Sequence, residues 1–161
     1  MIDRKIIWIT EGEIEFLESY LTKDMHCLEF GAGASTKWLA DRVSHLISIE
    51  HDSEWIKKVS ESLPGNVTLH QHNRDYSVYV SIFPDEHFDF ILVDGRDRVN
   101  CVKEALPKLK KGGYLMLDNS EREEYKESID LMEGYESYTQ IKPDSEGFVY
   151  PDWQTLWWKK Q

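Results

Sequence analysis

The sequence has few cysteines and no long apolar run. Cys27 and Cys101 stand far apart without a Cys-x-x-Cys spacing, which argues against a structural zinc site and favours two reduced core thiols. No apolar run approaches the roughly 20 residues that span a bilayer. The start, from Met1 to Lys5, lacks the apolar centre of a secretion signal. We therefore expect a cytoplasmic protein.

Basic residues are also in short supply. The 161 residues include 19 Lys and Arg against 30 Asp and Glu, so the formal net charge is -11. A chain of this charge repels phosphate backbones and anionic membranes unless a local basic patch overrides the net charge. We therefore expect neither nucleic acid nor a membrane among its partners.

The composition that remains is that of a globular protein. Hydrophobic residues make up 40% of the chain and charged residues 30%, which argues against disorder. A chain of this length fits one core, which already buries roughly two-thirds of the unfolded surface. We expect a single domain over residues 1–161, with an N-terminal helical segment over 1–24 and an α/β core over 25–161.

Short β-rich runs alternate with amphipathic stretches, which is typical of βαβ units. The expected strands cover residues 27–30, 45–50, 67–70, 88–93, 114–117, 135–141 and 153–159. The expected helices cover residues 36–43 and 53–63, a stretch from 99 towards the glycine pair at 112–113, and 120–134, where Ser120 and Glu123 form a possible capping box. For residues 71–86, helix and extended chain both stay open.

These elements predict a Rossmann-like, three-layer α/β sandwich with a mostly parallel, seven-stranded sheet. Its last two strands flank a turn-rich loop over residues 143–147 and should form an antiparallel C-terminal hairpin. In such sheets, ligands bind beyond the carboxyl ends of the strands. The candidate site should therefore lie at that edge.

Glycines and acidic residues follow the expected strands at this edge. Gly31 and Gly33 allow the backbone to turn sharply and approach a ligand, while Glu50 is placed to accept hydrogen bonds from two ribose hydroxyls. Thr36 stands where a G-x-G-x-x-G motif has its third glycine, which argues against a pyrophosphate. Glu29 suits a cationic amino-acid group better than phosphates. The pattern therefore predicts a nucleoside site.

Three segments, from Leu28 to Gly33, from Ile49 to Asp52 and from Phe88 to Gly95, together resemble the class I S-adenosylmethionine-dependent methyltransferases. The resemblance extends from about Met25 to Trp158. It implies S-adenosylmethionine as the cofactor and methyl transfer to an acceptor, for which we expect a small molecule. It also implies a set of cofactor-binding residues: Glu29, Gly31, Gly33, Ser35 and Thr36 around the methionine part, Glu50 at the ribose, His51, His72 and Asn73 at the adenine, and Asp94.

Asp94, Asp118 and Asn119 also resemble the metal triad of the catechol and caffeoyl-CoA O-methyltransferases, which implies a possible Mg²⁺ site. The match is partial, because those enzymes commonly carry a Lys soon after the first Asp, where this chain has Asp97 between two arginines. The alternative is that the three residues cap helix starts. If the acceptor is a hydroxyl, Asp94 or Asp118 is the candidate catalytic base.

Two other functions stay open at this point. The same fold and Glu50 could serve a nicotinamide-dependent oxidoreductase, although the third glycine is missing. The chain could also be a methyltransferase-like binding or regulatory module without catalysis. Arg96 and Arg98 could hold an acidic acceptor or pair with nearby carboxylates, and a homodimer is possible.

Overall fold

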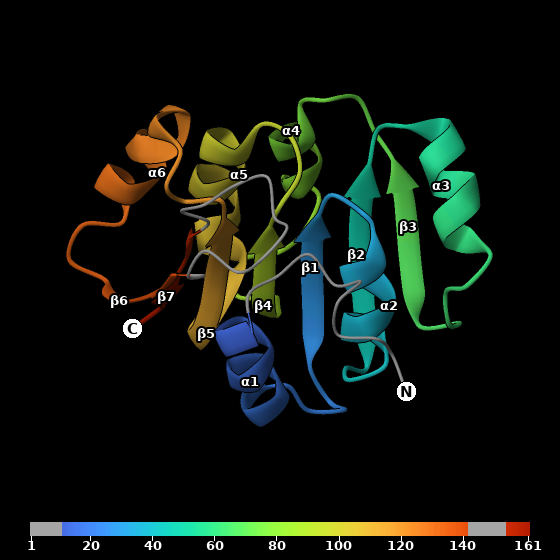
Figure 1. Cartoon of the computed structure of the whole chain (residues 1–161), viewed down its shortest axis with the longest axis horizontal. Helices are drawn as coiled ribbons and strands as arrows, with labels where there is room; N and C mark the ends of the chain where they lie inside the picture. Colours follow the sequence, from blue (N-terminus) through green and yellow to red (C-terminus); the bar gives the residue numbers. More distant parts are fainter. Residues whose placement is uncertain (1–10, 142–153) are drawn as a thin grey trace.

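The computed structural model describes residues 11–141 and 154–161, which form a seven-stranded sheet with helices on both faces (Figure 1). The strands are β1 (His26–Phe30), β2 (His45–Glu50), β3 (Val67–Gln71), β4 (Phe88–Val93), β5 (Leu109–Asp118), β6 (Glu136–Ile141) and β7 (Gln154–Lys159). The helices are α1 (Glu11–Tyr20), α2 (Ala34–Ala40), α3 (Ser53–Ser60), α4 (Tyr76–Val80), α5 (Arg98–Ala105) and α6 (Lys126–Leu131), with short 3₁₀ turns η2 (Leu106–Lys108) and η3 (Glu123–Tyr125).

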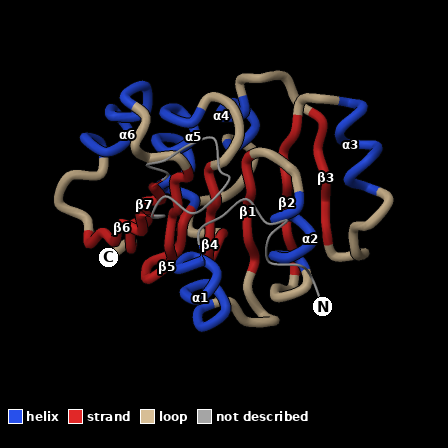
Figure 2. The backbone as a smooth tube through the Cα atoms, viewed as in Figure 1, coloured by secondary structure: helices blue, strands red, loops and turns tan. Residues whose placement is uncertain are grey.

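The strand order is β3-β2-β1-β4-β5-β7-β6. Strands β1 to β5 pair in parallel, and β7 lies antiparallel between β5 and β6. The order reverses at β1, where β2 lies on one side and β4 on the other. The expected mostly parallel sheet with an antiparallel C-terminal pair is confirmed (Figure 2).

Alternation along the strands gives the sheet two apolar faces. In β4, Phe90 and Leu92 pack with apolar residues of α1 and α2, whereas Ile91 and Val93 pack with residues of α4 and α5. Figure 1 shows α1 and α2 in front of the sheet and α5 behind it. The three layers therefore follow directly from the period of two in the buried strands. None of the described helices is long and apolar enough to cross a membrane.

Several element boundaries differ from those expected. The helix that was expected to run towards Gly112 ends at Ala105, because Pro107 stands in the 3₁₀ turn that follows, and the glycine pair lies inside β5. Ser120 does not start a helix, so that prediction is wrong. Asn119 adopts a left-handed conformation, and the chain turns before η3 begins at Glu123. Residues 76–80, left open from sequence, form α4.

Candidate functional site

A hollow of about 440 Å³ lies at the carboxyl ends of β1, β2 and β4, next to the point where the strand order reverses. Ligand sites in open parallel sheets occur at this position, and their volumes are about 300–1,000 Å³. The hollow is lined by residues 31–35, by Glu50, His51, Trp55 and Tyr76, and by residues 94–96.

Two loops touch at the floor of this hollow. The Asp94 N–H donates to the Phe30 carbonyl at 3.0 Å, and the Gly31 N–H donates to the Ile49 carbonyl at 2.8 Å. Gly31 has φ +96°, and a Cβ on it would lie 2.9 Å from the Asp94 carbonyl oxygen. A Cβ on Gly95 would lie 2.6 Å from the Tyr76 ring. Glycine is therefore required at both positions by the backbone and its packing.

Glu29 lies beneath the glycine loop and is fully buried, so it is absent from the lining of the hollow. Its carboxylate accepts hydrogen bonds from the hydroxyls of Ser35, Thr36 (2.6 Å) and Ser48 (2.7 Å). Thr36 Oγ1 in turn accepts from the Gly33 N–H at 2.8 Å. Burial raises the pKa of Glu29 to about 7, despite the three hydroxyls. Glu29 thus supports the loop from below, whereas sequence reasoning placed it against a ligand.

Glu50 ends β2 with only 7% of its surface exposed, and its carboxylate is held by surrounding donors. Oε1 accepts from the N–H groups of His51 (2.7 Å) and Asp52 (3.0 Å) and from the Tyr76 hydroxyl (3.2 Å). Oε2 accepts from the Ala32 N–H at a longer 3.3 Å. The side chain is fixed in place, and Oε2 is its less strongly engaged oxygen.

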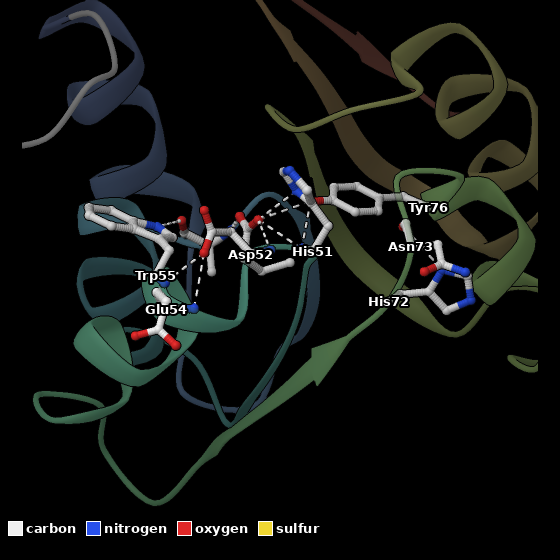
Figure 3. Close-up of polar contacts among 9 residues, drawn as sticks. His51, Asp52, Glu54, Trp55, His72, Asn73 and Tyr76 are labelled. Atoms are coloured by element: carbon white, nitrogen blue, oxygen red, sulfur yellow. Dashed lines mark hydrogen bonds and ion pairs between the residues drawn. The ribbon is translucent and has the colours of Figure 1, made fainter.

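Tyr76 joins the strand ends to α4. Its hydroxyl lies 2.7 Å from His51 Nδ1 and accepts from the His51 N–H at 3.0 Å, and Figure 3 shows the two side chains pointing towards one another. Burial and the neighbouring Glu50 raise the pKa of Tyr76 above its usual value. Sequence reasoning missed Tyr76, because the segment that carries it has no clear periodicity.

Trp55 was also missed. It stands in the first turn of α3, where the Asp52 carboxylate caps the N–H groups of Glu54 and Trp55 at 3.0 Å (Figure 3). Its indole N–H donates to the Ala32 carbonyl at 2.7 Å, and 40% of the residue stays exposed beside the hollow. A large, exposed aromatic surface at the rim of a pocket can stack on a planar ligand.

A second hollow, of about 400 Å³, lies beside the first and is lined by His51, Gln71, His72 and Asn73. His72 Nδ1 lies 3.2 Å from the Asn73 carbonyl oxygen. His51 borders both hollows, so the residues expected around an adenine do share one region.

The three candidate metal ligands meet around Arg98. Arg98 Nη2 lies 3.2 Å from Asp94 Oδ1, and Nη1 lies 3.3 Å from Asn119 Oδ1. Burial, followed by the neighbouring Asp118, raises the pKa of Asp94 well above its usual value. Among the described residues, no three His, Cys, Asp or Glu side chains are arranged to hold a metal ion. The residues do not fit Mg²⁺, because the guanidinium group occupies Oδ1 of Asp94, Oδ1 of Asn119 and the carbonyl oxygen of Asp118.

The comparisons with known proteins agree with this geometry. Residues 28–120 match a family model described as a methyltransferase domain. A precorrin-6y C5,15-methyltransferase from Geobacter metallireducens has a TM-score of 0.75 at 15% identity, with 100% of this chain and 94% of that chain covered. A Streptococcus mutans protein described as a methyltransferase, solved in complex with SAH, has a TM-score of 0.69 at 15% identity, with 99% of each chain covered. Among curated proteins, no sequence matches this chain significantly.

A third similar structure corrects one expectation. An rRNA methylase from Streptococcus thermophilus has a TM-score of 0.70 at 16% identity, with 100% of this chain and 99% of that chain covered. The prediction that excluded nucleic acid as a partner is therefore wrong, because a chain of the same fold and nearly the same length acts on RNA. Net charge describes the average over a whole surface, whereas an acceptor is bound by a local patch.

Proposed function

Because this chain belongs to a family of methyltransferase domains, we propose that the hollow beside β1, β2 and β4 binds S-adenosylmethionine and presents its methyl group to an acceptor. The observation that carries this proposal is the position of Glu50, a fixed carboxylate at the end of β2 that contacts the glycine loop at Ala32 and lines the hollow. The enzyme is an S-adenosylmethionine-dependent methyltransferase with the class I Rossmann-like fold.

The contacts suggest a role for each part of the hollow. We assign the ribose hydroxyls to Glu50, whose Oε2 is the less engaged oxygen. We assign the methionine part to the loop of residues 31–35, whose backbone stays open to the hollow at Gly33. The adenine is assigned to the region of His51, His72 and Asn73, where the second hollow begins. Glu29 acts indirectly, by supporting that loop.

The sulfonium of the cofactor supplies an activated methyl group, so the protein has to orient the acceptor atom and exclude water. Bound in the hollow, the cofactor would supply its methyl carbon to the acceptor lone pair, and the electrons of the broken carbon–sulfur bond would stay on sulfur. A hydroxyl acceptor also has to release a proton. Asp94 lines the hollow, whereas Asp118 is only 2% exposed, so Asp94 is the better placed of the two candidate bases.

Calorimetric titration of the full chain with S-adenosylmethionine, S-adenosylhomocysteine and NAD tests the cofactor. We expect micromolar binding of the first two, about -8 kcal/mol, and a loss of at least about tenfold in Glu50→Gln. Glu61→Gln is the matched control, because this exposed glutamate lies just past the end of α3. Binding of NAD alone would favour an oxidoreductase, and binding of none of the three by folded protein would favour a non-catalytic module.

For the acceptor, we propose a small molecule, since the hollow in which the methyl group would be presented is of small-ligand size. The test uses tritium-labelled S-adenosylmethionine with two pools, a small-molecule extract and total RNA. Label that enters the small-molecule pool in the wild type and not in Glu50→Gln would support the proposal. Label that enters RNA instead would refute it and leave methyl transfer intact.

A further inference from the structure

Arg98, the first residue of α5, donates all of its side-chain hydrogen bonds to oxygen atoms at the carboxyl ends of β4 and β5. A guanidinium group offers five N–H donors, and the structure has five hydrogen bonds from it. Nε donates to the Gly95 carbonyl (2.9 Å), Nη1 to the Asp118 carbonyl (2.6 Å) and to Asn119 Oδ1 (3.3 Å), and Nη2 to the carbonyl (3.2 Å) and Oδ1 (3.2 Å) of Asp94. Only 8% of Arg98 is exposed. The side chain therefore links the ends of β4 and β5.

The surrounding residues hold this arrangement from the other sides. The guanidinium lies over the ring of Tyr125, 5.0 Å from its centre. Asn119, which carries one of the accepting oxygens, has φ +53°, a left-handed conformation that asparagine adopts more readily than most residues. The preceding Asp97 is fixed as well, because its carboxylate accepts from the Ser77 N–H at 3.2 Å. A guanidinium fixed in this way leaves little room for a second cation.

The oxygen atoms that accept hydrogen bonds from Arg98 are of the types that bind divalent ions. Mg²⁺ and Ca²⁺ bind carboxylate, amide and carbonyl oxygens. Asp94 and Asn119 contribute side-chain oxygens to Arg98, and Asp118 contributes its carbonyl. A divalent ion at the same oxygens would be repelled by a guanidinium a few ångströms away. The Arg98 guanidinium and a divalent metal ion therefore cannot occupy this site together.

We infer that the Arg98 guanidinium takes the place of a metal ion at the carboxyl ends of β4 and β5. This methyltransferase is therefore independent of divalent ions. The inference rests on the proposed function only for the reaction that takes place beside this edge. It changes the class of acceptor that the edge can bind. Without a metal ion to chelate, two adjacent acceptor oxygens offer no advantage, and one nucleophilic atom oriented by side chains is sufficient.

The experiment measures Mn²⁺ binding to the full chain by electron paramagnetic resonance, in which bound ions lose the signal of free Mn²⁺. We expect the wild type to leave the signal unchanged and Arg98→Met to bind one ion per chain. Adding Asp94→Asn to Arg98→Met should abolish the binding. Arg42→Met is the matched control, because Arg42 also stacks on an aromatic ring, that of Trp38, but lies away from the site. It should bind no Mn²⁺.

Two results would overturn the inference: Mn²⁺ binding by the wild type that Asp94→Asn removes, or a folded Arg98→Met that binds no Mn²⁺. If Arg98→Met does not fold, Arg98→Lys is tested in its place, because it keeps a positive charge at the site and should still exclude Mn²⁺. Mn²⁺ binding by Arg98→Lys would also count against the inference. S-adenosylhomocysteine binding is titrated in the same samples with Mg²⁺ and with EDTA. A wild type that binds neither S-adenosylhomocysteine nor Mn²⁺ would refute the proposed function while supporting the role of Arg98.

Discussion

The two glycines of the loop after β1 should respond in opposite ways to the same substitution. Gly31 has φ +96°, and an added Cβ would meet the backbone of Asp94 and Gly95 at 2.9 Å. Gly33 has an extended φ of -174°, and an added Cβ would meet no atom within 4 Å. The open space beside Gly33 belongs to the hollow in which we place the cofactor. Alanine should therefore disrupt the fold at Gly31 and ligand binding at Gly33.

The magnitudes follow from the local geometry. A side chain at positive φ costs about 1–2 kcal/mol, and crowding against a fixed backbone adds about 1–3 kcal/mol. Gly31→Ala should thus lower the free energy of unfolding by about 2–5 kcal/mol, at roughly 2–4 °C of melting temperature per kcal/mol. Gly33→Ala should keep that free energy or raise it by about 0.4–1 kcal/mol. Its methyl group should weaken S-adenosylhomocysteine binding by at least about tenfold, or 1.4 kcal/mol.

Urea denaturation and calorimetric titration of the same preparations measure both effects. Gly65→Ala is the control for both, because an added Cβ there also meets no atom within 4 Å and the residue lies outside the hollow. Wild-type affinity in Gly33→Ala would show that the cofactor does not occupy the space beside that residue. Wild-type stability in Gly31→Ala would refute the argument that the two loops meet too closely for a side chain.

Two further predictions concern groups around the loop. Burial raises the pKa of Glu29 from 4.5 to about 7, so the folded state favours the protonated carboxyl. The contribution of Glu29 to the free energy of unfolding is fully present below pH 4.5, and about 3 kcal/mol of it is lost as the pH rises through 7. Glu29→Gln should remove this slope in urea denaturation between pH 5 and 8, and an unchanged slope would exclude Glu29 as its cause. Tyr76→Phe removes one of the donors to the Glu50 carboxylate and the hydroxyl next to His51 Nδ1, and it should cost about 1–3 kcal/mol of stability as well as cofactor affinity. Tyr138→Phe, at an exposed position of β6, is its control, and equal effects of the two variants would contradict the role of Tyr76.

The fold and the location of the hollow could be predicted from sequence because both follow from local patterns. Each of the first, second and fourth strands is a short apolar run that ends at an acid or a glycine loop. The parallel pairing then brings Gly31, Glu50 and Asp94 to one edge. Boundaries were less predictable where several signals compete, as at Gly112, which reads as a helix stop and lies instead within a strand.

The contacts that define the site were not predictable, because they join residues far apart in sequence. Tyr76 reaches Glu50 across 26 positions, and Trp55 reaches the Ala32 carbonyl across 23. Sequence alone also left two partners open for Arg98, an acidic acceptor or the nearby carboxylates. The ion pair with Asp94, at 3.2 Å, favours the second. The type of a residue indicates which contacts it can make, whereas the fold decides which groups lie within its reach.

The position of β7 has a consequence for how the chain assembles. In the sheet, β6 pairs with β7 and not with β5, although β6 precedes β7 in the chain. During synthesis, β6 therefore has to wait for residues 154–159 to emerge before it can join the sheet. A truncation that removes β7 would detach two strands and leave the backbone of β5 unpaired on that side from Tyr114 to Asp118. Such a fragment should be prone to edge-to-edge aggregation.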